Sequence, residues 1–255
     1  MFFRFSKYKY DKRKDRYSNT FLVSNHSYPE ETTKNNKADN VVYCFWTGDN
    51  EMSEQRKSGL ASMEANIGVK IELITPQKLD SYLKPEHPLH DAFPYLSLVH
   101  KSDYLRCYFM HHYGGGYLDI KHYRHSWASL FDKINRSDKW IMGYREIGEK
   151  GVAPVDGNLG EDLKQYWNVL IGNGAYICKP YTSFTHDWYV ELHRRLDVYY
   201  SDLKKHPGNI FGDNPGYPIP WTNILGDIFH PLCLKYSDKI MYSKKIKPDF
   251  KKKYR

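Results

Sequence analysis

The stretch of sequence that decides the fold is SDYLRCYFMHHYGGGYLDIK, residues 102–121. Its first half predicts a helix, because its apolar side chains fall on one helical face while Asp103 and Arg106 fall on another. Three glycines then end this helix, since glycine tolerates the positive φ at which helices commonly stop. The run that follows, residues 117–120, predicts a buried strand whose carboxyl end carries Asp119.

The sequence before this stretch predicts a β-α-β unit. Residues 41–46, VVYCFW, are a compact β-branched and aromatic run that predicts a buried strand. Residues 52–67 carry apolar side chains at helical spacing, and residues 69–74 alternate as a second strand does. Two strands joined by a helix favour a parallel sheet with a right-handed crossover.

The sequence after this stretch continues the alternation of strands and helices. We expect strands at residues 140–144 and 170–178, and an amphipathic helix at residues 183–204. Residues 145–165 are rich in Gly, Asp and Glu, which predicts an irregular loop. Residues 207–220 are rich in Gly and Pro, which suits a lid over a bound ligand.

Charge separates the body of the chain from its two ends. The chain of 255 residues has a net charge of +8, of which residues 1–20 carry +5 and residues 243–255 carry +6, so the rest is net negative. A nucleic-acid-binding face on the folded domain is therefore not expected. We predict one α/β domain over residues 40–242, with a Rossmann-like, mostly parallel sheet flanked by helices. The basic tails, residues 1–39 and 243–255, are either solvated or in peripheral contact with anionic lipid.

The cysteines and the hydropathy of the sequence indicate the cellular compartment of the protein. The four cysteines are far apart and form no CxxC pair, so a metal cluster or redox motif is not expected and free thiols are. The chain has no apolar run of about 18 residues, the length that a membrane span needs. These features predict a soluble, cytoplasmic protein.

Asp119 is the first candidate for a functional residue. Ligands of open α/β sheets bind outside the carboxyl ends of the strands, where an aspartate can coordinate a divalent cation or accept hydrogen bonds from a ribose. Asp103 and Arg106 lie three residues apart, so both can point at the same polar site. The alternative is that Asp103 caps the helix and pairs with Arg106 at the surface.

Residues 102–121 resemble the glycosyltransferases with a DXD-containing sugar-binding region and the related capsular polysaccharide synthesis proteins. The shared pattern is a Ser-Asp helix with Arg three residues after Asp, a Gly-Gly turn and a strand that ends in Asp-x-Asp. FWTG at residues 45–48 resembles the first strand of that family, and IPWTNILGDIFHPL at residues 219–232 resembles the C-terminal part of the capsular proteins. The similarity spans roughly residues 41–235.

The resemblance implies a GT-A fold, a UDP- or GDP-sugar donor, a glycan acceptor and retention of the anomeric configuration. It implies that Trp46 stacks on the base, that Asp103 and Arg106 hold the donor sugar and phosphates, and that Asp119 is the first acid of the DXD motif. The donor-binding residues expected in this way are Phe45, Trp46, Thr47, Ser102, Asp103, Arg106, Gly115, Tyr117, Asp119, Trp221 and Thr222.

Lys121 departs from the family pattern, because it stands where the second acid is usual. Residues two apart on a strand point to the same side, so we expect Lys121 to face the site together with Asp119. Three interpretations follow. Lys121 neutralises the diphosphate and the enzyme needs no metal; or Mn²⁺ or Mg²⁺ is bound by Asp119 with another ligand such as His122 or His230; or the protein binds nucleotide sugars or glycans without turnover.

The candidate catalytic residues are Asp119, Lys121 and Asn173. In the family a polar residue near residues 170–178 approaches the reacting sugar, which makes Asn173 a candidate. A retaining enzyme needs no carboxylate base, since the leaving phosphate can take the proton of the acceptor. His230 lies among apolar residues, so a buried core histidine is the alternative to a metal ligand.

Overall fold

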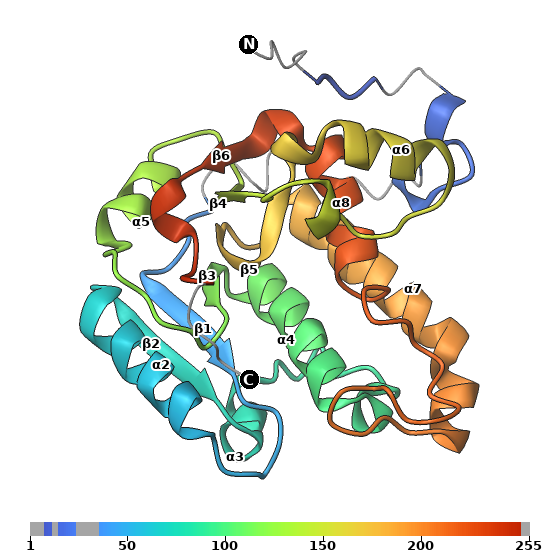
Figure 1. Ribbon diagram of the computed structural model, residues 1–255, viewed down its shortest axis with the longest axis horizontal. Coiled ribbons are helices and arrows are strands. Elements are labelled where there is room, and N and C mark those ends of the chain that lie inside the picture. Colours follow the sequence, from blue (N-terminus) through green and yellow to red (C-terminus); the bar gives the residue numbers. More distant parts are fainter. Residues whose placement is uncertain (1–7, 12–14, 24–35, 251–255) are drawn as a thin grey trace.

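The computed structural model describes residues 8–11, 15–23 and 36–250. A six-stranded sheet crosses this part of the chain in the order β2-β1-β3-β5-β4-β6 (Figure 1). Both pairings of β5 that the sheet contains are antiparallel and the other pairings are parallel, so β5 alone runs against its neighbours. The mostly parallel sheet is confirmed. The strands are β1 (Val41–Phe45), β2 (Lys70–Ile74), β3 (Gly115–Leu118), β4 (Ile141–Arg145), β5 (Ile171–Cys178) and β6 (Ile240–Tyr242).

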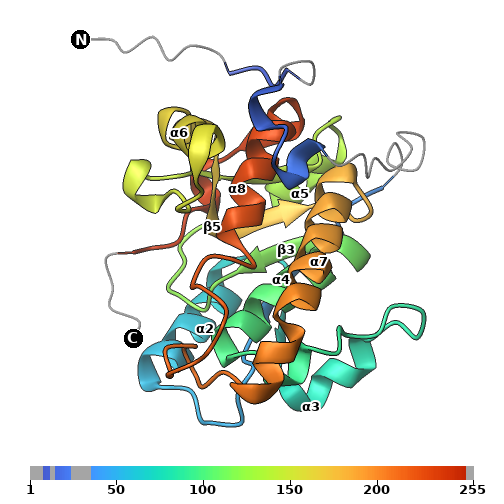
Figure 2. The ribbon, with the colours of Figure 1, turned by 90° about the vertical axis from the view of Figure 1, so that its right-hand side faces the viewer.

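Helices cover both faces of the sheet and make a single α/β domain, as expected. On one face α4 packs along α7 and touches β1 and β3, while α8 packs between α7 and β5 (Figure 2). On the other face α2 and α5 enclose a second apolar cluster. The helices are α2 (Glu54–Asn66), α3 (Pro76–Leu79), α4 (Leu98–His112), α5 (Ala128–Asn135), α6 (Gly157–Gln165), α7 (Ser183–Lys205) and α8 (Gly226–Lys235).

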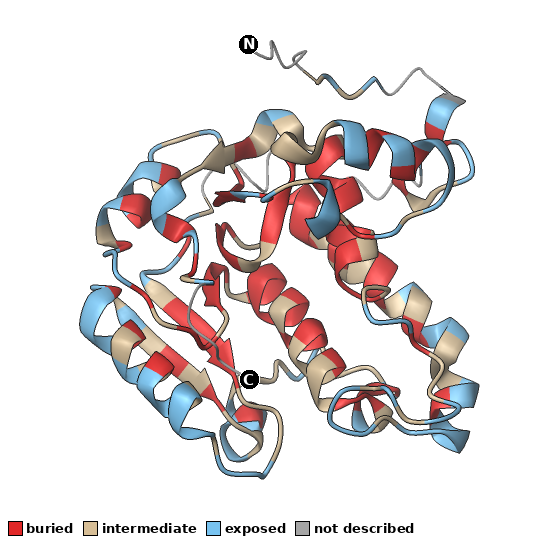
Figure 3. Cartoon of the chain, viewed as in Figure 1, coloured by how far each residue is buried: buried red, intermediate tan, exposed pale blue. Residues whose placement is uncertain are grey.

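The period of two along each strand explains the two clusters. On β1, Tyr43 and Phe45 point into the core beneath α4 and α7, whereas Val42 and Cys44 point into the core beneath α2 and α5. Because both faces of β1 are covered, this strand is apolar throughout, as parallel strands usually are. Figure 3 shows the result, with burial concentrated in the sheet and in the sides of the helices that face it.

The glycine turn between α4 and β3 sets the position of the candidate site. Gly114 and Gly115 have φ angles of +66° and +86°, so the predicted helix end at the glycines is confirmed. The strand itself is shifted from the prediction, because Gly115 already pairs with Cys178 and β3 ends at Leu118. Asp119 therefore follows the strand rather than ending it, and its amide donates to the Gly174 carbonyl at 2.9 Å.

We predict that Gly114→Ala destabilises the domain by about 2–4 kcal/mol, from the left-handed backbone and from overpacking together. A Cβ at Gly114 would lie 2.5 Å from Pro180 Cδ, whereas one at Gly157, with a φ of +65°, would meet nothing within 4 Å. Gly157→Ala therefore serves as the matched control and should cost only about 1 kcal/mol. Urea unfolding of both variants measures the difference, and equal losses would show that the contact with Pro180 is irrelevant.

The loop expected at residues 145–165 is partly wrong. It contains α6, whose buried Leu159 and Leu163 lie four residues apart on one helical face. The Gly- and Asp-rich composition obscured this short apolar pair.

The prediction of a C-terminal tail from residue 243 is also wrong for residues 243–250, the part of this segment that the structure describes. Ile246 is fully buried in the cluster beneath α2 and α5, and the Phe250 ring lies 4.8 Å from the Lys121 ammonium. At the other end, Arg16 pairs with Asp162 at 2.7 Å and anchors a short helical turn to α6. The remaining parts of both predicted tails, residues 1–7, 12–14, 24–35 and 251–255, lie outside the described residues.

The prediction of free thiols is met, since all four cysteines are buried and form no disulfide. Among the described residues, no helix combines the length and the apolar character that crossing a membrane requires.

Candidate functional site

A cavity of about 530 Å³ opens at the carboxyl ends of β1 and β3. Its volume is within the range of about 300–1,000 Å³ that is typical of small-ligand sites. The walls come from the ends of both strands, the start of α2, the first half of α4 and the segment that precedes α8. Eight of the predicted donor-binding residues line it: Phe45, Trp46, Thr47, Ser102, Arg106, Tyr117, Asp119 and Trp221.

The segment that leaves β1 forms the aromatic wall of the cavity. The Trp46 indole N–H donates to the Asn50 carbonyl at 2.7 Å, which fixes the ring after the strand has ended. The Thr47 hydroxyl donates to the Leu98 carbonyl at 2.6 Å and ties this segment to the first turn of α4. Phe45 stacks on Tyr117 with ring centroids 5.7 Å apart. The FWTG stretch is thus held rigidly beside α4.

Arg106 is the centre of the charged wall. Its Nη2 lies 3.2 Å from Asp103 Oδ1 and 3.7 Å from Asp119 Oδ1, and its Nη1 donates to the Asn173 carbonyl at 3.1 Å. Its guanidinium carbon lies 4.4 Å from the centre of the Tyr117 ring. The prediction that Asp103 and Arg106 share one polar site is correct, and Asp119 belongs to it as well.

The two aspartates of this network play different parts. The Asp119 side chain is 22 % exposed and lines the cavity, whereas the Asp103 side chain is 5 % exposed and lies behind Arg106. Burial raises the pKa of Asp103 more than the neighbouring Arg106 lowers it. Burial also opposes ionisation of Asp119, but Lys121 and Arg106 outweigh it and leave the pKa of Asp119 below its usual value. Asp103 therefore orients Arg106, while Asp119 presents an ionised carboxylate to a ligand.

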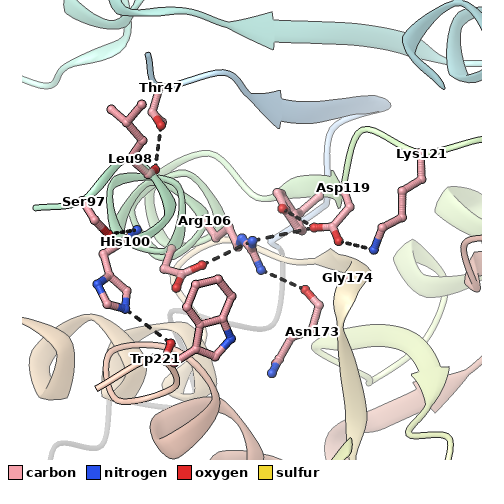
Figure 4. A network of polar contacts seen from close by, with 12 residues as sticks. Thr47, Ser97, Leu98, His100, Arg106, Asp119, Lys121, Asn173, Gly174 and Trp221 are labelled. Atoms are coloured by element: carbon pink, nitrogen blue, oxygen red, sulfur yellow. Dashed lines mark hydrogen bonds and ion pairs between the residues drawn. The ribbon is translucent and has the colours of Figure 1, made fainter. Parts of the chain in front are cut away.

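Both oxygens of the Asp119 carboxylate have close proton donors. The Tyr117 hydroxyl donates to Oδ1 at 2.6 Å, and the Lys121 ammonium donates to Oδ2 at 2.6 Å. Figure 4 shows Arg106 and Lys121 reaching Asp119 from opposite sides. Asp119 and Lys121 contact each other through the bend that follows β3 rather than through strand alternation, and Lys121 does not face the cavity, contrary to the prediction. The Lys121 side chain is 4 % exposed and does not line the cavity.

The residues around Asp119 do not fit a divalent cation. Mg²⁺ and Ca²⁺ are bound by several oxygen ligands. Here Asp119 already holds the Lys121 ammonium, and Glu51, which also lines the cavity, holds the Lys57 ammonium. His230 is fully buried in α8, where its Nδ1 accepts from the Ala153 amide at 3.1 Å, and it does not line the cavity. His122 lies with its Nε2 3.5 Å from the Ser58 hydroxyl.

Within residues 8–11, 15–23 and 36–250, no group of three or more His, Cys, Asp or Glu side chains is arranged to hold a metal ion. The manganese or magnesium ion stays a prediction from the family resemblance.

Three further predicted residues are placed away from the cavity. Gly115 lies at the amino end of β3, where a Cβ would come within 2.9 Å of the Val41 carbonyl oxygen. The Thr222 carbonyl accepts from the amides of Leu225 and Asp227 at the start of α8. Asn173 meets Arg106 through its backbone carbonyl, and its side-chain oxygen is buried without a hydrogen-bond partner.

Sequence reasoning missed several residues of the cavity. Arg56 lies in the first turn of α2 and donates through Nη1 to the Ile120 carbonyl at 2.8 Å. The signal was its place just after a strand end, where the start of the next helix meets the ligand edge of the sheet. Ile210 and Phe211, which are 51 % and 48 % exposed, form an apolar rim together with Trp221. They belong to the segment predicted as a lid.

Comparison with known proteins identifies one family. Residues 3–150, more than half of the chain, match the family described as capsular polysaccharide synthesis protein. No curated protein and no solved structure matches the chain. The match includes β1, α4, β3 and Lys121, and it ends before Asn173 and Trp221, so the similarity predicted for residues 219–232 lies outside it. The family suggests a role in polysaccharide biosynthesis, and the chain belongs to the capsular polysaccharide synthesis protein family.

Proposed function

We propose that the protein is a glycosyltransferase that moves a sugar from a UDP- or GDP-sugar to a glycan acceptor in polysaccharide synthesis. The observation that carries the proposal is the cavity at the carboxyl ends of β1 and β3, with an aromatic wall at Trp46 and a charged wall at Arg106 and Asp119. A nucleotide sugar has the same division, since its base is flat and its diphosphate and sugar are polar. The family supplies the biosynthetic context.

The geometry supports a division of labour for the transfer. The base stacks on Trp46, and the Arg106 guanidinium faces the diphosphate, which gains negative charge as it leaves. The ionised Asp119 accepts hydrogen bonds from donor hydroxyls and balances the positive charge that develops at the anomeric carbon. The departing phosphate takes the proton of the acceptor hydroxyl, and the anomeric configuration is retained.

The apolar rim completes the site on the acceptor side. Ile210, Phe211 and Trp221 are about half exposed at the edge of the cavity. Closure of their segment over a bound donor would cover these side chains and exclude water from the diphosphate. The acceptor glycan then approaches along this rim.

The proposal is tested by a thermal-shift screen of UDP, GDP and their sugars on the full chain. At least one nucleotide sugar should raise the melting temperature, because a ligand that binds only the folded state stabilises it. The same compound should be hydrolysed slowly in the absence of acceptor. If none of these compounds shifts the melting temperature, the proposal is wrong.

A catalytically impaired binding protein is the second candidate. It is favoured by Lys121, which occupies the place of an acid and contacts Asp119 at 2.6 Å. This candidate predicts the thermal shift without hydrolysis or transfer.

Trp46→Ala should weaken the binding of UDP or GDP about five- to hundredfold, because stacking of a base on an aromatic ring contributes about 1–3 kcal/mol. Trp46→Phe keeps a ring on the same wall and should retain most of the affinity. Isothermal titration calorimetry measures both. Wild-type affinity in the alanine variant would mean that the base binds elsewhere.

A further inference from the structure

Two arginines line the cavity close to Asp119. Arg106 reaches it from α4 at 3.7 Å, and Arg56 reaches the backbone next to it from α2, through its bond to the Ile120 carbonyl. Both guanidinium groups line the cavity together with the Asp119 carboxylate. The cavity therefore presents two fixed cations at the place where the chain leaves β3.

Lys121 supplies a third positive charge from behind. Its ammonium lies 2.6 Å from Asp119 Oδ2 and 4.8 Å from the Phe250 ring, and its side chain is 4 % exposed. A buried ammonium in contact with a carboxylate oxygen repels any other cation from that oxygen, and the repulsion is strong where water is excluded. Lys121 thus occupies the side of Asp119 that a metal ion would need.

The charged side chains around Asp119 favour the binding of an anion even when no metal ion is present. Among the described residues, the basic side chains of Arg56, Arg106 and Lys121 lie close to the acidic side chains of Asp103 and Asp119. Burial raises the pKa of Asp103, which shifts this carboxyl toward its neutral form and increases the positive excess. Glu51 also lines the cavity, but Lys57 neutralises it at 2.5 Å.

We propose that Arg56 and Arg106 bind the diphosphate of the donor directly and that Lys121, as a fixed counter-ion of Asp119, makes a divalent cation unnecessary. The inference rests on the proposed function and adds to it a phosphate-binding residue, Arg56, and metal independence. Guanidinium groups suit this task, since their planar N–H donors match two phosphate oxygens at once.

The first experiment measures the affinity of the full chain for UDP and GDP by calorimetry, in EDTA and then with added Mn²⁺. The expected result is that the dissociation constant for the nucleotide that binds changes less than about threefold between the two conditions. Binding that appears only with Mn²⁺ would overturn metal independence and leave the proposed function intact. Absence of binding in both conditions would overturn the proposed function and this inference with it.

The second experiment tests the place of Lys121. Lys121→Asp creates a second acid next to Asp119, so its affinity in EDTA should fall at least about tenfold and return on addition of Mn²⁺. Lys121→Met removes the ammonium without adding a ligand, so Mn²⁺ should give no recovery. Melting temperatures establish that each variant is folded. Wild-type affinity of Lys121→Met in EDTA would show that the ammonium is not needed.

The third experiment tests Arg56. Arg56→Gln should weaken UDP or GDP about ten- to hundredfold in EDTA, yet leave the affinity for the nucleoside unchanged, because hydrogen bonds to charged groups are among the stronger ones. Lys133→Gln is the control, since Lys133 is an exposed basic residue on α5 and does not line the cavity. If both variants weaken binding equally, Arg56 acts only through its net positive charge, and the proposal that it binds the diphosphate directly is wrong.

Discussion

Asp119→Asn is expected to lower the turnover number for sugar transfer at least about a hundredfold while the chain stays folded. Asparagine has the size of aspartate and keeps an oxygen that can accept from the Tyr117 hydroxyl, which donates to Asp119 at 2.6 Å. It removes the negative charge that balances the developing positive charge on the donor. Affinity for the nucleoside diphosphate should not fall, because Arg106 and Lys121 then lose a competing anion.

The measurement separates turnover from binding. Initial rates of donor hydrolysis and transfer give the turnover number, and calorimetry with UDP or GDP gives the affinity. Asp202→Asn is the control, since Asp202 is 61 % exposed on α7 and pairs only with the nearby Lys205 among the ion pairs of the described residues. Asp119→Ala should also abolish transfer, but it breaks a buried ion pair at a cost of about 3–5 kcal/mol. Undiminished turnover in the folded Asp119→Asn variant would exclude Asp119 from catalysis.

The second large effect expected is a loss of stability in mild acid. A cluster of histidines lies between α4 and α7. His111 and His112 end α4, and His193 belongs to α7. The ring centroid of His87 lies 4.5 Å from that of His112, that of His90 lies 5.2 Å from that of His193, and that of His186 lies 6.0 Å from that of His111. Burial first, and the neighbouring histidines second, lower the pKa of His111 to about 2 and that of His112 to about 3. Burial and His90 lower the pKa of His193 to about 4.

The sign of the effect follows from the unfolded chain. An unfolded histidine has a pKa of about 6.5, so below that pH the unfolded chain binds protons that the folded chain refuses. Each such group makes the free energy of unfolding fall by about 1.4 kcal/mol per pH unit, which for His111 amounts to about 2 kcal/mol at about pH 5. Asp103 and Glu146, whose pKa values burial raises, act in the opposite direction. Their effect develops as the pH falls through their raised folded pKa and is complete near the lower unfolded pKa of carboxyl groups, so it offsets part of the loss that the histidines cause.

Urea unfolding at about pH 7.5 and about pH 5 tests this prediction. The wild type should lose several kcal/mol between the two, a large part of the 5–15 kcal/mol that is typical of a domain. His111→Gln removes one titrating group and should reduce the loss, whatever it costs at the higher pH. His206→Gln, at an exposed position, should leave the loss unchanged. Equal stability of the wild type at both pH values would mean that the cluster opens to water at no cost.

The elements that the sequence determines are those with a strong local pattern. The strand at Val41–Phe45 is an apolar run that is mostly buried, the strand at Ile171–Cys178 is apolar apart from Asn173, and α7 is long enough for its helical period to be plain. The glycines after α4 predicted the turn that places Asp119. The helix Gly157–Gln165 was not predicted, because two leucines in a polar segment are too short a pattern to distinguish a helix from a loop.

The residues of the candidate site also fall into two groups, those that a local sequence pattern predicts and those that only tertiary packing brings to the cavity. Helical spacing predicted that Asp103 and Arg106 lie together, and the glycine turn predicted that Asp119 lies near the end of the next strand, because both are local properties of the chain. Their expected role in donor binding came from the family resemblance. Arg56 could not be ranked above the other basic residues, since its place depends on how α2 packs against the bend after β3. The same holds for Ile210 and Phe211, which meet the cavity only through the path of their segment over α4.

Lys121 shows the difference most clearly. Its position two residues after Asp119 predicted that both side chains face the site, and the spacing to the glycines identified Lys121 as a departure from the family pattern. Only the tertiary structure decided that its ammonium is buried against Asp119 and Phe250 instead of facing the cavity. The physical reason is that the burial of Lys121 depends on Phe250, which lies 129 positions later in the sequence, as well as on its sequence neighbours. Because this packing excludes water from the ammonium, Lys121 is a fixed counter-ion of Asp119 and does not contact a ligand.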